Sequence, residues 1–140
     1  MRRHRLRAAV VGSLFLVPLA AQVPSPASFL GHEIGADEKL CNYTDLVRYF
    51  RAVAAASDRV RLVDIGRTSY GQSMTMAVIT SPTNQARLEQ IRATAVRLCR
   101  ARDADPKVAA QLAEDGRAVV WVDAGLHATE SIAGQNIIEL

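Results

Sequence analysis

Two side chains near the end of the chain, His127 and Glu130, have the types and the spacing of a metal-binding pair. At a separation of three residues on one helical turn, an imidazole nitrogen and a carboxylate oxygen can converge on one point. Zinc binds both donor types at about 2.0–2.2 Å, and its catalytic sites have three protein ligands and a water molecule. Because His-x-x-Glu also occurs at ordinary helix starts, its value as a signal depends on the residues around it.

A short apolar run, Val119 to Val122, precedes the pair and reads VVWV. Such a β-branched and aromatic run predicts a strand that is buried on both faces of a sheet flanked by helices. We expect the strand to end near Asp123 and a turn at Gly125 to lead into a helix. Since ligands bind at the carboxyl ends of strands in open α/β sheets, this turn is well placed to form a site.

The segment VVWVDAGLHATE at residues 119–130 resembles the zinc carboxypeptidases of the M14 (carboxypeptidase A-like) family, in particular large secreted bacterial members. The resemblance extends upstream to FLGHEIGADEKL at residues 29–40 and DIGRTSYGQSM at residues 64–74. It implies an α/β fold with a mixed sheet flanked by helices, of which this chain is the amino-terminal part. It also implies that His127 and Glu130 are Zn²⁺ ligands in an enzyme that hydrolyses a peptide or protein substrate.

In that family the third zinc ligand, the arginine that binds the substrate's terminal carboxylate and the general base all lie further along the chain. The helix-forming run from Ser131 to Leu140 has no stop signal. We therefore expect an amino-terminal fragment that is inactive by itself. One alternative is a non-catalytic secreted α/β remnant or interaction module, if the protein ends at Leu140. Another is an unrelated metal site that acts on a non-peptide amide.

The first 21 residues have the pattern of a secretory signal peptide. Four arginines lie among the first seven residues, and an uncharged apolar run from Ala8 to Ala21 follows them. That run is too short to span a bilayer, so no stable membrane span is expected after cleavage near Ala21 or Gln22. The pattern predicts a secreted or periplasmic protein. A membrane anchor or a disordered basic arm is the alternative.

The composition fits one globular domain. The chain has 140 residues, of which 49% are hydrophobic and 22% charged, and this leaves room for one core. The formal charge of +3 is due to the leader arginines, and the rest of the chain has no basic and aromatic cluster that predicts nucleic-acid binding. We expect an extended segment at residues 22–36 and the catalytic-domain part at residues 37–140.

The spacing of apolar residues predicts the elements that precede the site. A helix is expected from Asn42 to Ser57. Strands at residues 60–65 and 74–80 should form a hairpin around a glycine-containing turn. Two further helices are expected, one containing residues 88–99 and one at residues 106–114. The antiparallel hairpin beside a parallel strand would make the sheet mixed.

Cysteine, histidine and aspartate residues elsewhere in the chain also carry reactive or ligating side chains. Cys41 and Cys99 could form a disulfide in an exported protein or remain two buried thiols, and the sequence leaves both open. His32 is expected in a loop, because the His-Glu-x-x-His motif fails where Ala36 replaces the second histidine. Asp123, or a nearby backbone carbonyl, could hold the second ring nitrogen of His127.

Overall fold

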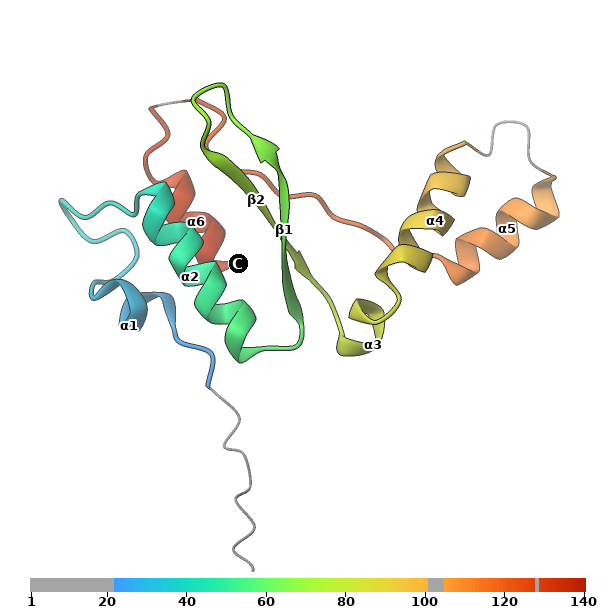
Figure 1. Ribbon diagram of the computed structural model, residues 1–140, viewed down its shortest axis with the longest axis horizontal. Helices are drawn as coiled ribbons and strands as arrows, with labels where there is room; N and C mark the ends of the chain where they lie inside the picture. The colour runs from blue at the N-terminus through green and yellow to red at the C-terminus, as the bar shows by residue number, and fades with distance from the viewer. Residues whose placement is uncertain (1–21, 101–104, 128) are drawn as a thin grey trace, which may run out of the picture.

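The computed structural model describes residues 22–100, 105–127 and 129–140. The predicted signal peptide, residues 1–21, lies outside this range. In chain order the elements are α1 (Pro26–Leu30), α2 (Tyr43–Ala56), β1 (Val60–Arg67), β2 (Ser73–Ile79), α3 (Pro82–Gln85), α4 (Leu88–Cys99), α5 (Pro106–Asp115) and α6 (Ala133–Glu139). Figure 1 shows α1, α2 and α6 on one side of the hairpin, and α4 and α5 beyond α3 on the other side.

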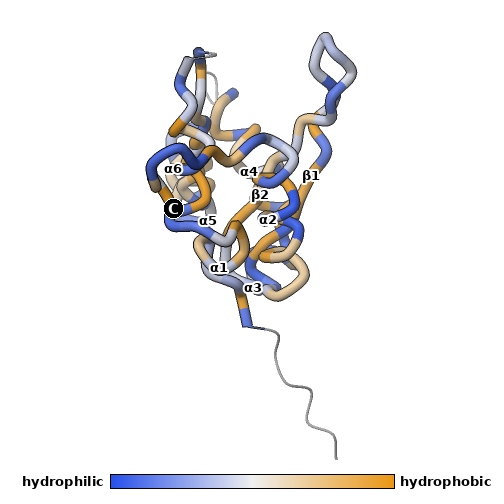
Figure 2. Tube along the Cα trace, turned by 90° about the vertical axis from the view of Figure 1, so that its left-hand side faces the viewer, coloured by the Kyte–Doolittle hydropathy of each residue, from blue (hydrophilic) through white to orange (hydrophobic). Residues whose placement is uncertain are grey.

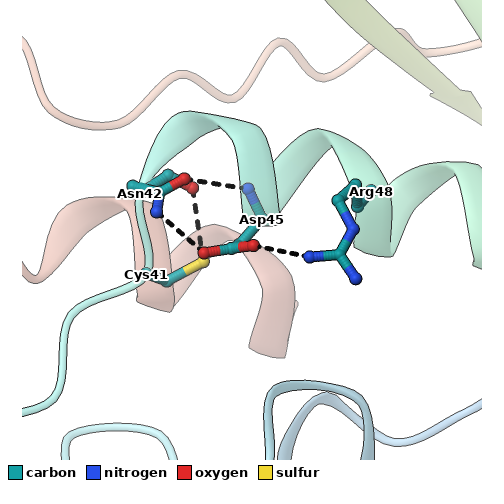
Figure 3. A network of polar contacts seen from close by, with 4 residues as sticks. All are labelled: Cys41, Asn42, Asp45 and Arg48. Carbon is teal, nitrogen blue, oxygen red and sulfur yellow. Dashed lines mark hydrogen bonds and ion pairs between the residues drawn. The ribbon is translucent and has the colours of Figure 1, made fainter.

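Helix α2 begins at the predicted position because Asn42 caps it. The Asn42 Oδ1 atom accepts a hydrogen bond from the backbone N–H of Asp45 at 3.0 Å, which satisfies one of the free donors of the first turn. The Asp45 carboxylate in turn accepts from Asn42 Nδ2 at 2.8 Å and from Arg48 Nη1 at 2.9 Å (Figure 3). An acidic residue in the first turn also interacts favourably with the helix dipole. The predicted helix is confirmed.

The core lies where the two ends of the described chain meet. Its buried residues are Cys41, Tyr49 and Ile138. Tyr49 makes edge-to-face contacts with Phe29 at 5.5 Å and Phe50 at 6.0 Å between ring centroids, an arrangement that aromatic pairs prefer. Helix α2 carries both apolar and polar residues (Figure 2), and its apolar residues recur every three or four positions, as expected for a helix with one buried face. Helix α6 therefore completes a core that α1 and α2 begin.

The predicted hairpin is also confirmed. Strands β1 and β2 pair antiparallel, with Val60 opposite Ile79, and the turn closes through a hydrogen bond from Gly71 N to the Thr68 carbonyl oxygen at 2.9 Å. Gly71 has φ +78, a conformation that glycine adopts without steric cost. Beyond the hairpin, α4 and α5 pack against each other, so both predicted helices are present as well. The α/β class of the prediction is confirmed.

The third predicted strand is wrong. Residues Val119–Val122 belong to no sheet, and their exposed fractions are 72%, 82%, 64% and 53% in chain order. The sheet of the described residues contains β1 and β2 alone. A strand that is buried on both faces needs paired neighbours and helices above and below it. The described residues provide neither for this run, so it stays extended and apolar at the surface.

A second correction concerns the segment predicted to be extended at residues 22–36. Residues 26–30 form the short helix α1. Ser25 caps it, because Ser25 Oγ accepts from Ser28 N at 3.3 Å, and Pro26 occupies the first helical position. Both features favour a helix start.

Within the described residues no helix has the length and apolar character to cross a membrane.

The two cysteines are free thiols in the structure. Cys41 is buried just before α2, whereas Cys99 is exposed at the end of α4. Of the two alternatives that the sequence left open, the disulfide is not formed, and one of the two thiols is buried. Burial raises the pKa of the Cys41 thiol, and the nearby Asp45 carboxylate adds to this effect. Thiolate chemistry at Cys41 is therefore suppressed.

Candidate metal site

A tight turn carries His127 and Glu130. It follows Gly125, which has φ +81. The backbone N–H of Glu130 donates to the His127 carbonyl oxygen at 3.0 Å, and this bond brings the two residues to the same side of the chain. The N–H of Ala133 then donates to the Glu130 carbonyl oxygen at 3.1 Å. Because Ala133 is the first residue of α6, the turn continues directly into that helix.

The two predicted ligands face each other. The distance between His127 Nδ1 and Glu130 Oε1 is 2.5 Å, and the side chains are 71% and 40% exposed. The hydrogen bond with His127 holds the pKa of the Glu130 carboxyl below its usual value, and the backbone N–H groups of His127 and Leu126 act in the same direction. Glu130 is therefore a carboxylate at neutral pH. The turn thus holds one imidazole nitrogen and one anionic carboxylate oxygen in direct contact at an accessible place on the surface.

An open hollow of about 450 Å³ adjoins this pair. It is lined by Asp123, Ala124, Gly125, Leu126, Glu130, Ala133 and Asn136. Asp123 lies on the hollow, but no hydrogen bond among the described residues joins it to His127. The prediction that Asp123 holds the second ring nitrogen is therefore not supported. The hollow leaves room for a further group next to the Glu130 carboxylate.

The donor types fit zinc, which binds imidazole nitrogen and carboxylate oxygen. The number of donors is smaller than a closed site needs, since no group of three His, Cys, Asp or Glu side chains comes together in the part of the chain that the structure describes. His32 lies in the turn after α1, where its Nδ1 donates to the Glu33 carbonyl oxygen at 2.9 Å. Its predicted loop position is confirmed. The described residues thus bring together two side chains of the types that zinc binds.

Sequence reasoning did not single out Gln135. This residue is completely buried in α6, only five positions after Glu130. The available signal was its place between Ile132 and Ile138, at the three-residue spacing of a helix face that is otherwise apolar. A polar residue at such a position must find partners in the interior.

We expect Gly125→Ala to lower the free energy of unfolding by about 1–2 kcal/mol, the typical strain of a side chain in left-handed backbone. Steric overlap does not contribute to this loss, because the nearest atom to a Cβ at this position is Ala133 Cβ at 3.6 Å. The strain falls on the turn that holds His127 and Glu130. Urea denaturation of the two proteins measures the effect.

Gly134→Ala is the matched control. Gly134 lies within α6, its φ is not in the left-handed region, and a Cβ there is 3.6 Å from Leu46 Cδ1. Alanine at a helical position without a clash is expected to be neutral or to stabilise by up to about 1 kcal/mol. Equal losses of stability in both variants would contradict the importance of the left-handed conformation at Gly125.

Comparison with known proteins adds one finding. A family model described as zinc carboxypeptidase, Peptidase_M14, matches residues 46–140, which is more than half of the chain. The match includes most of α2, the hairpin, both candidate ligands and α6. Searches of curated proteins and of solved structures found no match. The chain therefore belongs to the zinc carboxypeptidase family M14, and the resemblance that the sequence suggested is confirmed.

Proposed function

We propose that the protein serves zinc-dependent peptide hydrolysis of the metallocarboxypeptidase type, with His127 and Glu130 as two of three protein ligands to Zn²⁺. Membership of the family supports hydrolysis of peptides in general. The observation that carries the finer proposal is the proximity of His127 Nδ1 and Glu130 Oε1, which lie 2.5 Å apart on one accessible turn. The pair lies within the matched range and has the donor types of a catalytic zinc site.

The chemistry of the pair fits this role. Glu130 offers a carboxylate whose low pKa keeps it charged, and His127 presents Nδ1 on the side of that carboxylate. Both side chains are accessible, so a metal ion can reach them without opening the core. Bound zinc polarises a peptide carbonyl and lowers the pKa of a coordinated water molecule. The third ligand, the general base and the carboxylate-binding arginine implied by the resemblance are not among the described residues.

The predicted signal peptide supports a proposal about the compartment in which the protein works. The basic start and the apolar run of residues 1–21 support export, so we propose that the protein works in a secreted or periplasmic form. Extracellular peptides or proteins would then be its substrates. Amino-terminal sequencing of the exported protein tests this proposal, and an intact Met1 in that sample would contradict cleavage.

Two observations favour a second candidate for the 140 residues by themselves, a non-catalytic module. The described residues bring no third donor to the pair, and two ligands hold zinc weakly compared with three or four. The apolar run Val119–Val122 is also exposed, as in a surface that binds another polypeptide. Tight one-to-one zinc binding by the isolated chain would count against this candidate.

A zinc titration tests the proposed ligands directly. We expect added Zn²⁺ to shift the ring signals of His127 in the NMR spectrum of the chain. His32 is the internal control, since its Nδ1 faces a backbone carbonyl oxygen and no carboxylate partner. Equal responses of both histidines, or no response of His127, would contradict the assignment.

A further inference from the structure

Gln135 joins the last helix to a loop near the start of the described chain. Its Oε1 accepts from the backbone N–H of Gly35 at 2.9 Å, and its Nε2 donates to the Lys39 carbonyl oxygen at 2.9 Å. These partners lie 100 and 96 positions earlier in the sequence. The side chain is 0% exposed, and no larger side chain is fully buried among the described residues. One amide thus connects both ends of the described chain.

Both hydrogen bonds of the Gln135 side chain are needed to keep buried polar groups paired. A buried amide that lacks partners is unfavourable, and so are buried backbone groups that lose theirs. An apolar residue at position 135 could satisfy neither the Gly35 N–H nor the Lys39 carbonyl. Both partners are backbone groups, so the interaction does not use any side chain of the loop. The contact therefore fixes the position of α6 relative to the loop formed by residues 31–40.

The position of α6 is transmitted to Glu130 through a short run of backbone. Ala133, the first residue of α6, donates to the Glu130 carbonyl oxygen at 3.1 Å. The N–H of Gln135 donates to the Ile132 carbonyl oxygen at 2.9 Å. No flexible linker separates the helix from the turn. A displacement of α6 therefore moves Glu130 relative to His127.

Helix α6 is also held by packing against α2 along its length. Gly134 approaches Leu46 closely, with a Cβ position 3.6 Å from Leu46 Cδ1, and Ile138 is buried beside Tyr49. These contacts are apolar and set the distance between the helices, and α6 lies alongside α2 in Figure 1. Apolar contacts alone do not fix how far a helix slides or rotates. The directional bonds of Gln135 supply that restraint.

We propose that Gln135 is a positioning residue for the candidate metal site. Through Gly35 and Lys39, the loop of residues 31–40 holds the start of α6 so that Glu130 stays opposite His127. The part of this inference that concerns the metal rests on the proposed function. The part that concerns the turn stands on the hydrogen bonds alone.

The chain offers a matched control in its second buried glutamine. Gln85 is 8% exposed, and its Nε2 donates to the carbonyl oxygens of Arg59 at 2.8 Å and Val78 at 2.9 Å. It lies in α3 at the far end of the hairpin, well separated from α6 in Figure 1. Gln85→Leu therefore removes two buried hydrogen bonds from a region that does not touch the site.

The experiment compares Gln135→Leu with Gln85→Leu by three measurements. These are urea denaturation, the amide exchange rates of Glu130 and Ala133, and the zinc affinity reported by the His127 ring signals. We expect both variants to lose stability. Only Gln135→Leu should speed exchange at these amides, by about 10-fold, and weaken zinc binding about 10- to 100-fold, as loss of groups that orient a ligand does.

The outcomes separate the two proposals. Equal exchange rates at Glu130 in both variants would show that Gln135 is merely structural and would overturn the inference. If exchange rises only in Gln135→Leu but Zn²⁺ never affects His127 in the parent chain, the metal assignment is wrong and the positioning of the turn stands. Should Gln135→Leu fail to fold, Gln135→Glu replaces it. That variant keeps an acceptor for Gly35 N–H and loses the amide donor to Lys39, so unchanged exchange at Glu130 would also overturn the inference.

Discussion

We expect replacement of His127 with alanine to lower the zinc affinity of the protein by at least about 100-fold and to abolish the proposed peptide hydrolysis. Groups that only orient a metal ligand already account for about 10- to 100-fold, so loss of the ligand itself must exceed that. Glu130 would remain as a single donor, since no third donor joins the pair among the described residues. Zinc content after dialysis and hydrolysis of a peptide with a free carboxyl terminus measure the two effects.

Two companion variants sharpen this result. Glu130→Gln keeps the shape of the side chain and removes its charge, so it should lose zinc as well, because a neutral amide is a poor zinc ligand. His32→Ala removes a histidine whose ring bonds a backbone carbonyl and should retain both zinc and activity. An active His127→Ala enzyme with normal zinc content would refute the assignment.

Replacing Ile138 with alanine lowers the free energy of unfolding by about 2–5 kcal/mol, the usual range for such truncations in a core. Ile138 is 6% exposed and packs with Cys41 and Tyr49 in the cluster that joins α2 to α6. For a protein of ordinary stability, about 5–15 kcal/mol, this is a large share of the total. Urea denaturation followed by circular dichroism measures the change.

Ile79→Ala is the control for this prediction. Ile79 ends β2 and is 66% exposed, so its truncation leaves no cavity. The expected loss is within about 1 kcal/mol, the span of strand propensities. Similar losses for the two variants would mean that α6 does not complete the core in solution.

The elements that were predicted correctly are those that carry their own local signals. Helix α2 has a capping Asn42 and an apolar face, and the hairpin has two apolar runs around a turn that contains Gly71. Helix α5 begins at Pro106 and ends before Gly116. In each case the residues that decide the structure lie within the element or next to it. Tertiary contacts were not needed to predict them.

The predictions that failed depended on contacts between distant residues. The run Val119–Val122 was expected to be buried, but burial of a central strand depends on neighbouring strands that the described residues do not provide. The state of Cys41 and Cys99, which the sequence left open, depended on whether the segments that carry them approach each other. The importance of Gln135 became visible only because the chain brings Gly35 and Lys39 to it.

The candidate site has one feature that depends on local residues and others that depend on distant residues. The pairing of His127 with Glu130 was predictable, because a three-residue spacing in a tight turn is a local property, and the structure brings the two side chains together. The third donor of a zinc site comes from a distant part of a fold, so local spacing could not reveal it. The same limit applies to Asp123, whose predicted bond to His127 the structure does not support.

The location of bound zinc tests the central claim most directly. Crystals of the protein grown with Zn²⁺ and measured at the zinc absorption edge reveal the ion in an anomalous difference map. We predict a peak at about 2.0–2.2 Å from a ring nitrogen of His127 and from a carboxylate oxygen of Glu130. A peak at other residues, with His127 and Glu130 still in direct contact with each other, would contradict the assignment.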